Sequence, residues 1–119
     1  MGGAVAVRIA ASPGVEAVLG LAPWLPDKLD VSPLRGKRLD VLHGSLDRNL
    51  PAVPGVSAQS SRAGWERALA AGGDGTYTLI RGALHAIALR SRGGAPVPLP
   101  RARTWARLAA ERVQSFAAA

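Results

Sequence analysis

Cysteine is absent from the 119 residues, and only two histidines are present, His43 and His85. The lack of thiols excludes a disulfide framework, a cysteine-based zinc site and a thiol nucleophile. Two histidines without a third ligand at a suitable spacing do not form a zinc site. The glycine pairs lack the lysine of a phosphate loop and the pattern of a dinucleotide-binding loop. We therefore expect neither a metal nor a cofactor.

Long apolar runs are also missing. No run approaches the roughly 18 residues that a membrane-spanning helix requires. Residues 1–11 carry neither a basic leader nor the apolar stretch of a signal peptide. The sequence thus predicts a soluble, unexported, cytoplasmic protein with no membrane partner.

Acidic residues and lysine are scarce, so the formal net charge is +7, with 8 acidic residues against 15 basic ones. Most of the basic residues are arginines, scattered from Arg8 to Arg112. Nucleic-acid interfaces usually add clustering, aromatic platforms or a docking motif. None is visible, and richness in arginine and alanine is typical of a GC-rich coding bias. We therefore expect no nucleic-acid partner; the alternative is a basic surface that binds phosphate in a salt-sensitive way.

Two short apolar runs bounded by proline or glycine predict buried strands, at 16–22 and 38–43. The β-branched and aromatic residues at 76–81 predict a third strand. Residues 1–11 predict a helix that is apolar on nearly all sides, as in a protein interior. A second helix is expected over 60–71, with a serine cap and a Gly-Gly stop. A third is expected over 101–116, with one apolar stripe of Trp105, Leu108, Ala109, Val113 and Phe116. Residues 24–37 and 93–100 are interpreted as loops.

This alternation of strands and helices predicts an α/β fold, with about three parallel strands, right-handed crossovers and flanking helices. At 119 residues the chain is a single domain. Three strands are few for a parallel sheet, which normally has further strands beside it. We therefore interpret residues 1–119 as one partial domain with an unpaired strand edge.

Two polar side chains follow the carboxyl ends of neighbouring strands. Asp47 comes just after the strand at 38–43, and His85 just after the strand at 76–81. Adjacent parallel strands lie about 4.8 Å apart, so these loops can bring the two within hydrogen-bond reach. A carboxylate in that position orients an imidazole that acts as general base. The alternatives are a turn-forming aspartate, an ordinary loop histidine and, for His43, a packed structural histidine.

The segment HGSLDR after one strand and GALHA after the next resemble the acid and histidine loops of the α/β-hydrolase family, whose triad runs Ser, Asp, His along the chain. The opening MGGAVA is similar to the residues after the serine in the nucleophile elbow G-x-S-M-G-G. The resemblance implies a partial α/β-hydrolase fold, with the family's strands six to eight. Residues 1–119 would then be the C-terminal half of a family domain.

The resemblance also implies a function, namely hydrolysis of carboxylic esters or related acyl bonds in a small-molecule substrate. Asp47 and His85 would be the acid and base of the triad, and the backbone amide of Met1 would be an oxyanion-hole donor in a longer chain. Trp24 is a candidate for the acyl pocket. None of the eight serines lies in a G-x-S-x-G context, and Ser45 lies in the acid loop. The nucleophile is thus expected upstream of Met1, as after a false start codon, and the chain alone is expected to be inactive.

A different class of function remains open. The chain could be a non-catalytic remnant or a small partner-binding module that pairs its exposed sheet edge with another chain, including a second copy of itself. A defined, folded dimer or hetero-complex would favour this alternative.

Overall fold

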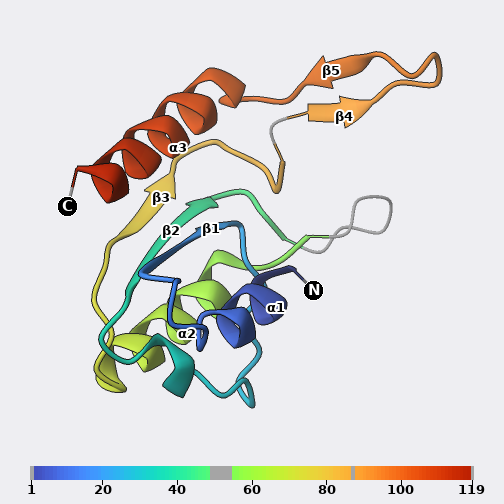
Figure 1. The fold of residues 1–119 in the computed structure, drawn as a ribbon. Helices are drawn as coiled ribbons and strands as arrows, with labels where there is room; N and C mark the ends of the chain where they lie inside the picture. Colours follow the sequence, from blue (N-terminus) through green and yellow to red (C-terminus); the bar gives the residue numbers. More distant parts are fainter. Residues whose placement is uncertain (1, 49–54, 87, 119) are drawn as a thin grey trace.

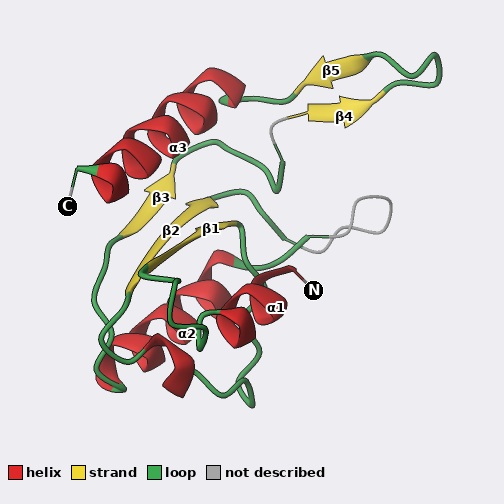
Figure 2. Cartoon of the chain, viewed as in Figure 1, coloured by secondary structure: helices red, strands yellow, loops and turns green. Residues whose placement is uncertain are grey.

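The computed structural model describes residues 2–48, 55–86 and 88–118. Its helices and strands follow one another along the chain as Figure 2 shows. The elements are α1 (Gly2–Ile9), β1 (Ala17–Leu21), the short 3-10 helix η1 (Ser32–Leu34), β2 (Arg38–Gly44), α2 (Ala58–Ala70), β3 (Tyr77–Ile80), β4 (Ala88–Arg90), β5 (Pro96–Pro98) and α3 (Ala102–Ala117).

The three longer strands form a parallel sheet in the order β1-β2-β3. The predicted α/β class with about three parallel strands is therefore confirmed. In the register, Leu21 pairs with Leu42 on one side of β2, and Gly44 pairs with Ile80 on the other. Within the described residues, β1 and β3 each pair along one edge. All three strands end at the same edge of the sheet, where the loops carrying Asp47 and His85 begin (Figure 1).

Helices cover both faces of the sheet, with α1 and α2 on one face and α3 on the other (Figure 1). Side chains alternate along β2, so Leu39 and Val41 join the core beneath α1 and α2. Leu42 joins the second core, beneath α3, together with Ile80 and the fully buried Trp105. From Leu39 to Gly44 the residues of β2 are buried, as expected for the central strand of a two-sided parallel sheet.

Helix α2 begins earlier than the sequence predicted. Its cap is Ser57, whose hydroxyl accepts a hydrogen bond from the backbone N–H of Ser60 at 3.1 Å. The serine-rich run 57–61 offers several possible caps, and the sequence alone favoured a start near residue 60. In the structure Ser61 lies inside the helix and is fully buried.

Helix α1 differs from the expectation of a helix enclosed on all sides. Val7 is buried against the sheet, whereas Val5 and Ile9 are 52% and 57% exposed. The described residues pack against one side of this helix and leave the other side uncovered. The apolar pattern of a helix shows which of its sides can be buried, but it does not show which sides other elements actually contact.

The segment 93–100 was expected to be a loop, but part of it forms a strand. β5 pairs with β4 as an antiparallel hairpin, which projects away from the sheet (Figure 1). Pro96 and Pro98 lack a backbone N–H and are typical of edge strands, so their presence obscured this strand.

In α3, Leu108 and Ala109 pack toward the core as predicted, but Val113 is 55% exposed, so its place on the apolar stripe was wrong.

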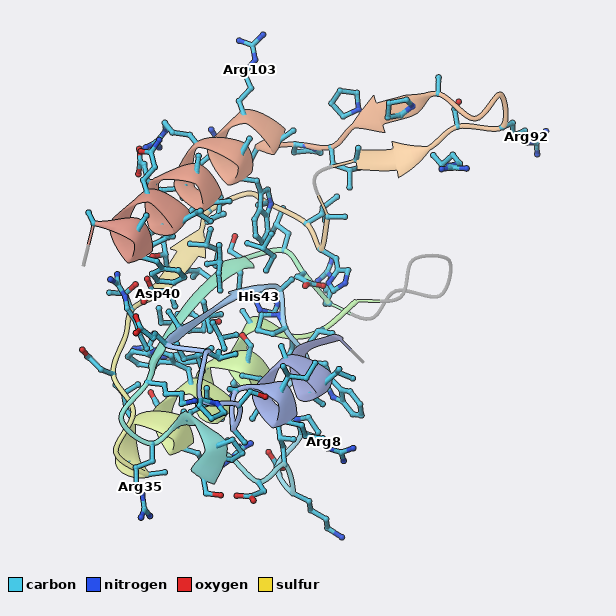
Figure 3. The ribbon with its side chains drawn as sticks, in the orientation of Figure 1. Arg8, Arg35, Asp40, His43, Arg92 and Arg103 are labelled. Carbon is cyan, nitrogen blue, oxygen red and sulfur yellow. The ribbon has the colours of Figure 1, made fainter. Side chains whose placement is uncertain are left out.

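None of the helices in the described part of the chain is long and apolar enough to span a membrane. The labelled arginines in Figure 3 point away from the molecule on different sides, and all four are exposed: Arg8, Arg35, Arg92 and Arg103. These four therefore do not share one basic face.

Candidate active site at the carboxyl edge of the sheet

Asp47 and His85 meet where β2 and β3 end. The carboxylate oxygen Oδ2 of Asp47 lies 2.7 Å from Nδ1 of His85. The Asp47 side chain is fully buried, whereas that of His85 is 40% exposed. The predicted proximity of the two side chains is confirmed, and their difference in exposure suits a buried acid that orients a base accessible to a ligand.

Backbone contacts hold the two loops together. The N–H of Ser45 donates to the carbonyl of Ile80 at 3.0 Å, and the N–H of Leu46 donates to the carbonyl of Ala83 at 2.9 Å. The Ser45 hydroxyl accepts a hydrogen bond from the N–H of Gly82 at 2.9 Å. Ser45 therefore ties the acid loop to the histidine loop, a structural role that the sequence did not reveal.

Gly44, the last residue of β2, lies directly against the histidine loop. A Cβ atom at this position would overlap the carbonyl oxygens of Ala83 and Leu84, which are backbone atoms and cannot rotate away. The close approach of the two loops thus requires glycine at residue 44.

Replacing Gly44 by alanine is expected to push the histidine loop away from Asp47 and to lower the free energy of unfolding by about 1–3 kcal/mol, the usual cost of overpacking. Urea denaturation of the 119-residue chain measures this change. Gly14→Ala is the matched control, because a Cβ atom at residue 14 meets no atom within 4 Å. Equal stability of G44A and G14A would show that the loops are not in close contact.

Two N–H groups donate to the Asp47 carboxylate, and the ring of His43 lies beside it. Oδ2 lies within hydrogen-bond distance of His85 Nδ1 and also 2.8 Å from Nε2 of His43. Oδ1 accepts a hydrogen bond from the backbone N–H of Val56 at 2.9 Å. Gly55 permits this approach, because a Cβ atom there would overlap Oδ1 of Asp47. Both carboxylate oxygens therefore accept a hydrogen bond, and the His43 ring packs against Oδ2.

The bond to Asp47 fixes which nitrogen of His85 carries the hydrogen. A carboxylate only accepts hydrogen bonds, so Nδ1 is the donor and Nε2 of the neutral ring carries the lone pair. Among residues 2–48, 55–86 and 88–118, no side chain or backbone group forms a hydrogen bond with this Nε2. The ring thus presents a proton acceptor away from the acid, the orientation that a general base requires.

An apolar cavity of about 360 Å³ opens beside His85. Trp24, the predicted pocket residue, lines it and is 46% exposed. Gly2 and Gly3, at the amino end of α1, line the same cavity. The predicted oxyanion-hole residue Met1 lies outside the described residues. The cavity therefore brings together His85, the candidate pocket residue Trp24 and the start of α1.

Behind Asp47 lies a buried polar cluster that sequence reasoning missed. Nδ1 of His43 lies 2.7 Å from the hydroxyl of Ser61 on α2, which lies 2.8 Å from the hydroxyl of Tyr77 on β3. Burial raises the pKa of the Tyr77 phenol above its ordinary value of 10.0, so the phenol stays neutral and donates to the carbonyl of Ala58 at 2.7 Å. His43 was interpreted as a packed structural histidine, and it is indeed fully buried.

The part of the chain that the structure describes contains no group of three or more histidine, aspartate or glutamate side chains arranged to hold a metal ion. The chain matches no protein-family model, no curated protein and no solved structure. The chemistry of the site is therefore argued from its geometry.

Proposed function

We propose that this chain supplies the acid and the base of a serine-hydrolase triad of the α/β-hydrolase type, acting on carboxylic esters or related acyl bonds. The observation that carries the proposal is the 2.7 Å contact between the buried Asp47 carboxylate and Nδ1 of the half-exposed His85, at the edge of an apolar cavity. The resemblance of the HGSLDR and GALHA segments to the family's acid and histidine loops supports the same assignment.

In this proposal His85 acts twice. Its Nε2 takes the proton of a serine hydroxyl as the serine oxygen attacks the acyl carbon, and it then gives that proton to the departing alcohol oxygen. A water molecule then attacks the acyl carbon of the acyl-enzyme. His85 takes the proton of the water and gives it to the serine oxygen, and the product carboxylic acid is released. Asp47 keeps Nδ1 protonated and stabilises the imidazolium formed in each step.

The serine in this proposal comes from the turn that leads into α1. A strand before α1 would run parallel to β1 in the same sheet and would end at the carboxyl edge, where α1 begins. Gly2 and Gly3 lie on the wall of the cavity that His85 also lines, so this turn would face the imidazole. Of the serines near the site, Ser61 is buried against His43, and Ser45 lies in the acid loop with its oxygen against the N–H of Gly82 and makes no hydrogen bond to His85.

The cavity favours an uncharged, apolar acyl group. Apart from His85, its wall is built from glycine, alanine, valine, leucine, proline and tryptophan residues. A charged acyl chain would find no ionic partner among them and would lose its hydration. Trp24 adds a flat apolar surface near the opening, which suits contact with a hydrocarbon chain.

A fluorophosphonate probe, which reacts with activated serines, tests the proposal. We expect no labelling of the 119-residue chain and stoichiometric labelling of an extended chain that carries a Gly-x-Ser segment directly before Met1. The reading frame upstream of the Met1 codon is expected to continue into such a segment. A stop codon directly before Met1, or labelling of Ser45 in the 119-residue chain, would overturn the proposal.

A second candidate function is pairing of the sheet edge with another chain. The observation in its favour is that the cavity runs along β1, with Val18 to Leu25 contributing consecutive residues to its wall. Consecutive residues line a groove when both the backbone and the side chains of a strand face it, as at an unpaired edge. A well-folded dimer of the 119-residue chain, together with an extended chain that the probe fails to label, would favour this function over hydrolysis.

A further inference from the structure

His43 is buried at the end of β2, and both of its ring nitrogens have polar partners. Nε2 lies 2.8 Å from Oδ2 of Asp47 and 2.7 Å from the carbonyl oxygen of Val56. Nδ1 lies 2.7 Å from the hydroxyl of Ser61. Its side chain has no exposed surface, so it cannot touch a substrate. Figure 3 shows it between the sheet and α2.

The partners of His43 determine its hydrogen positions. Both groups near Nε2 are acceptors, a carboxylate and a carbonyl, so Nε2 carries the hydrogen. In the neutral ring Nδ1 is then an acceptor, and the single hydrogen of Ser61 points to it. The Ser61 hydroxyl also lies 3.0 Å from the carbonyl of Ala58, but that carbonyl accepts from Tyr77 at 2.7 Å, whereas Nδ1 is the nearer acceptor for Ser61. Every hydrogen of the cluster thus has an acceptor.

We propose that His43 is a positioning residue for the acid, holding the Asp47 carboxylate in the orientation in which Oδ2 meets His85. This inference rests on the proposed function of Asp47 and His85. Oδ2 lies between His85 Nδ1 at 2.7 Å and His43 Nε2 at 2.8 Å. Oδ1 accepts from the N–H of Val56, whose carbonyl is in turn held by His43 Nε2. Without His43, the Val56 carbonyl loses its donor and Oδ2 loses the ring that packs against it, so the carboxylate is free to rotate away from His85.

The backbone of Val56 links His43 to Asp47. Its N–H donates to Oδ1 of Asp47, and its carbonyl accepts from His43 Nε2. An apolar residue in place of His43 would leave both the Val56 carbonyl and the Ser61 hydroxyl without their present partner in a buried region. The segment that presents the N–H to Asp47 would therefore shift as well.

The matched variants His43→Gln and His43→Leu separate positioning from packing. The glutamine side chain can place an N–H donor near the position of Nε2, whereas leucine fills a similar volume without a donor. Long-range ¹H–¹⁵N correlation spectra of the 119-residue chain report the tautomer of His85. We expect a protonated Nδ1 in the wild-type chain and in H43Q, and a mixture of tautomers in H43L. Ser61→Ala, a smaller change, is expected to shift the ring signals of His43 and His85 while leaving the chain folded.

In the extended chain, H43L is expected to lower kcat about 10- to 100-fold with KM unchanged, the usual cost of losing a group that orients another, and H43Q is expected to recover most of it. Unchanged His85 spectra in both H43L and S61A would overturn the inference, whatever the extended chain does. Spectra that respond to these substitutions in a protein whose extended chain hydrolyses no ester would instead refute the proposed function and leave the positioning of Asp47 by His43 in place.

Discussion

Replacing His85 by alanine in the extended chain is expected to lower kcat for an activated ester ~10⁶-fold, because the members of a triad act as a unit and loss of the base removes nearly all of its effect. The substitution removes a half-exposed side chain, so its effect on the free energy of unfolding should be small by comparison. Steady-state kinetics together with urea denaturation measure the two effects separately.

The companion variant Asp47→Asn is expected to lower kcat ~10⁴-fold. The N–H groups of His85 and Val56 donate to the two oxygens of the carboxylate. An amide has only one oxygen, so its NH₂ group must face at least one of these donors. Ser45→Ala is the control: it loses the hydrogen bond from Gly82 but no triad member, and most of the activity should remain. Retention of activity in H85A would show that another group is the base.

Replacing Trp105 by alanine is expected to have the largest effect on stability, about 3–5 kcal/mol in the free energy of unfolding, through lost burial and the cavity left behind. Trp105 is 1% exposed and attaches α3 to the sheet through Leu42 and Ile80. It also packs with Ala83, in the loop that leads to His85. The same substitution should therefore disturb the histidine loop.

Val113→Ala on the same helix is the matched control, since Val113 is 55% exposed and its truncation should change the free energy of unfolding by less than about 0.5 kcal/mol. Urea denaturation of the 119-residue chain measures the free energy of unfolding of both variants. It is followed by far-ultraviolet circular dichroism, because that signal does not depend on tryptophan fluorescence. If W105A and V113A prove equally stable, α3 does not pack on the sheet in the way described.

Short-range patterns in the sequence were sufficient to predict the sheet and the contact between acid and base. The strand at 38–43 was assigned from Leu39, Val41 and Leu42 before Gly44. Parallel strands end at one edge, so the approach of Asp47 to His85 followed from the strand assignments. These inferences need only local composition and the geometry of neighbouring strands.

The role of His43 could not be predicted in this way. Its side chain contacts Ser61, 18 residues further along the chain, and that contact depends on where α2 crosses the sheet. The one available signal was the alternation in β2, which places His43 on the same face as Leu39 and Val41 and hence toward α2. The partly exposed surface of α1 could not be predicted either, because the apolar pattern of a helix does not specify which elements pack against it.

The hydrogen bonds from Ser45 to Ile80 and from Leu46 to Ala83 have a consequence for local unfolding. They continue the β2–β3 ladder past the ends of both strands, so we expect the two loops to open together. A fluctuation that frees one loop breaks the same bonds that hold the other. We therefore expect Asp47 and His85 to belong to one cooperative unit and to separate in the same opening events.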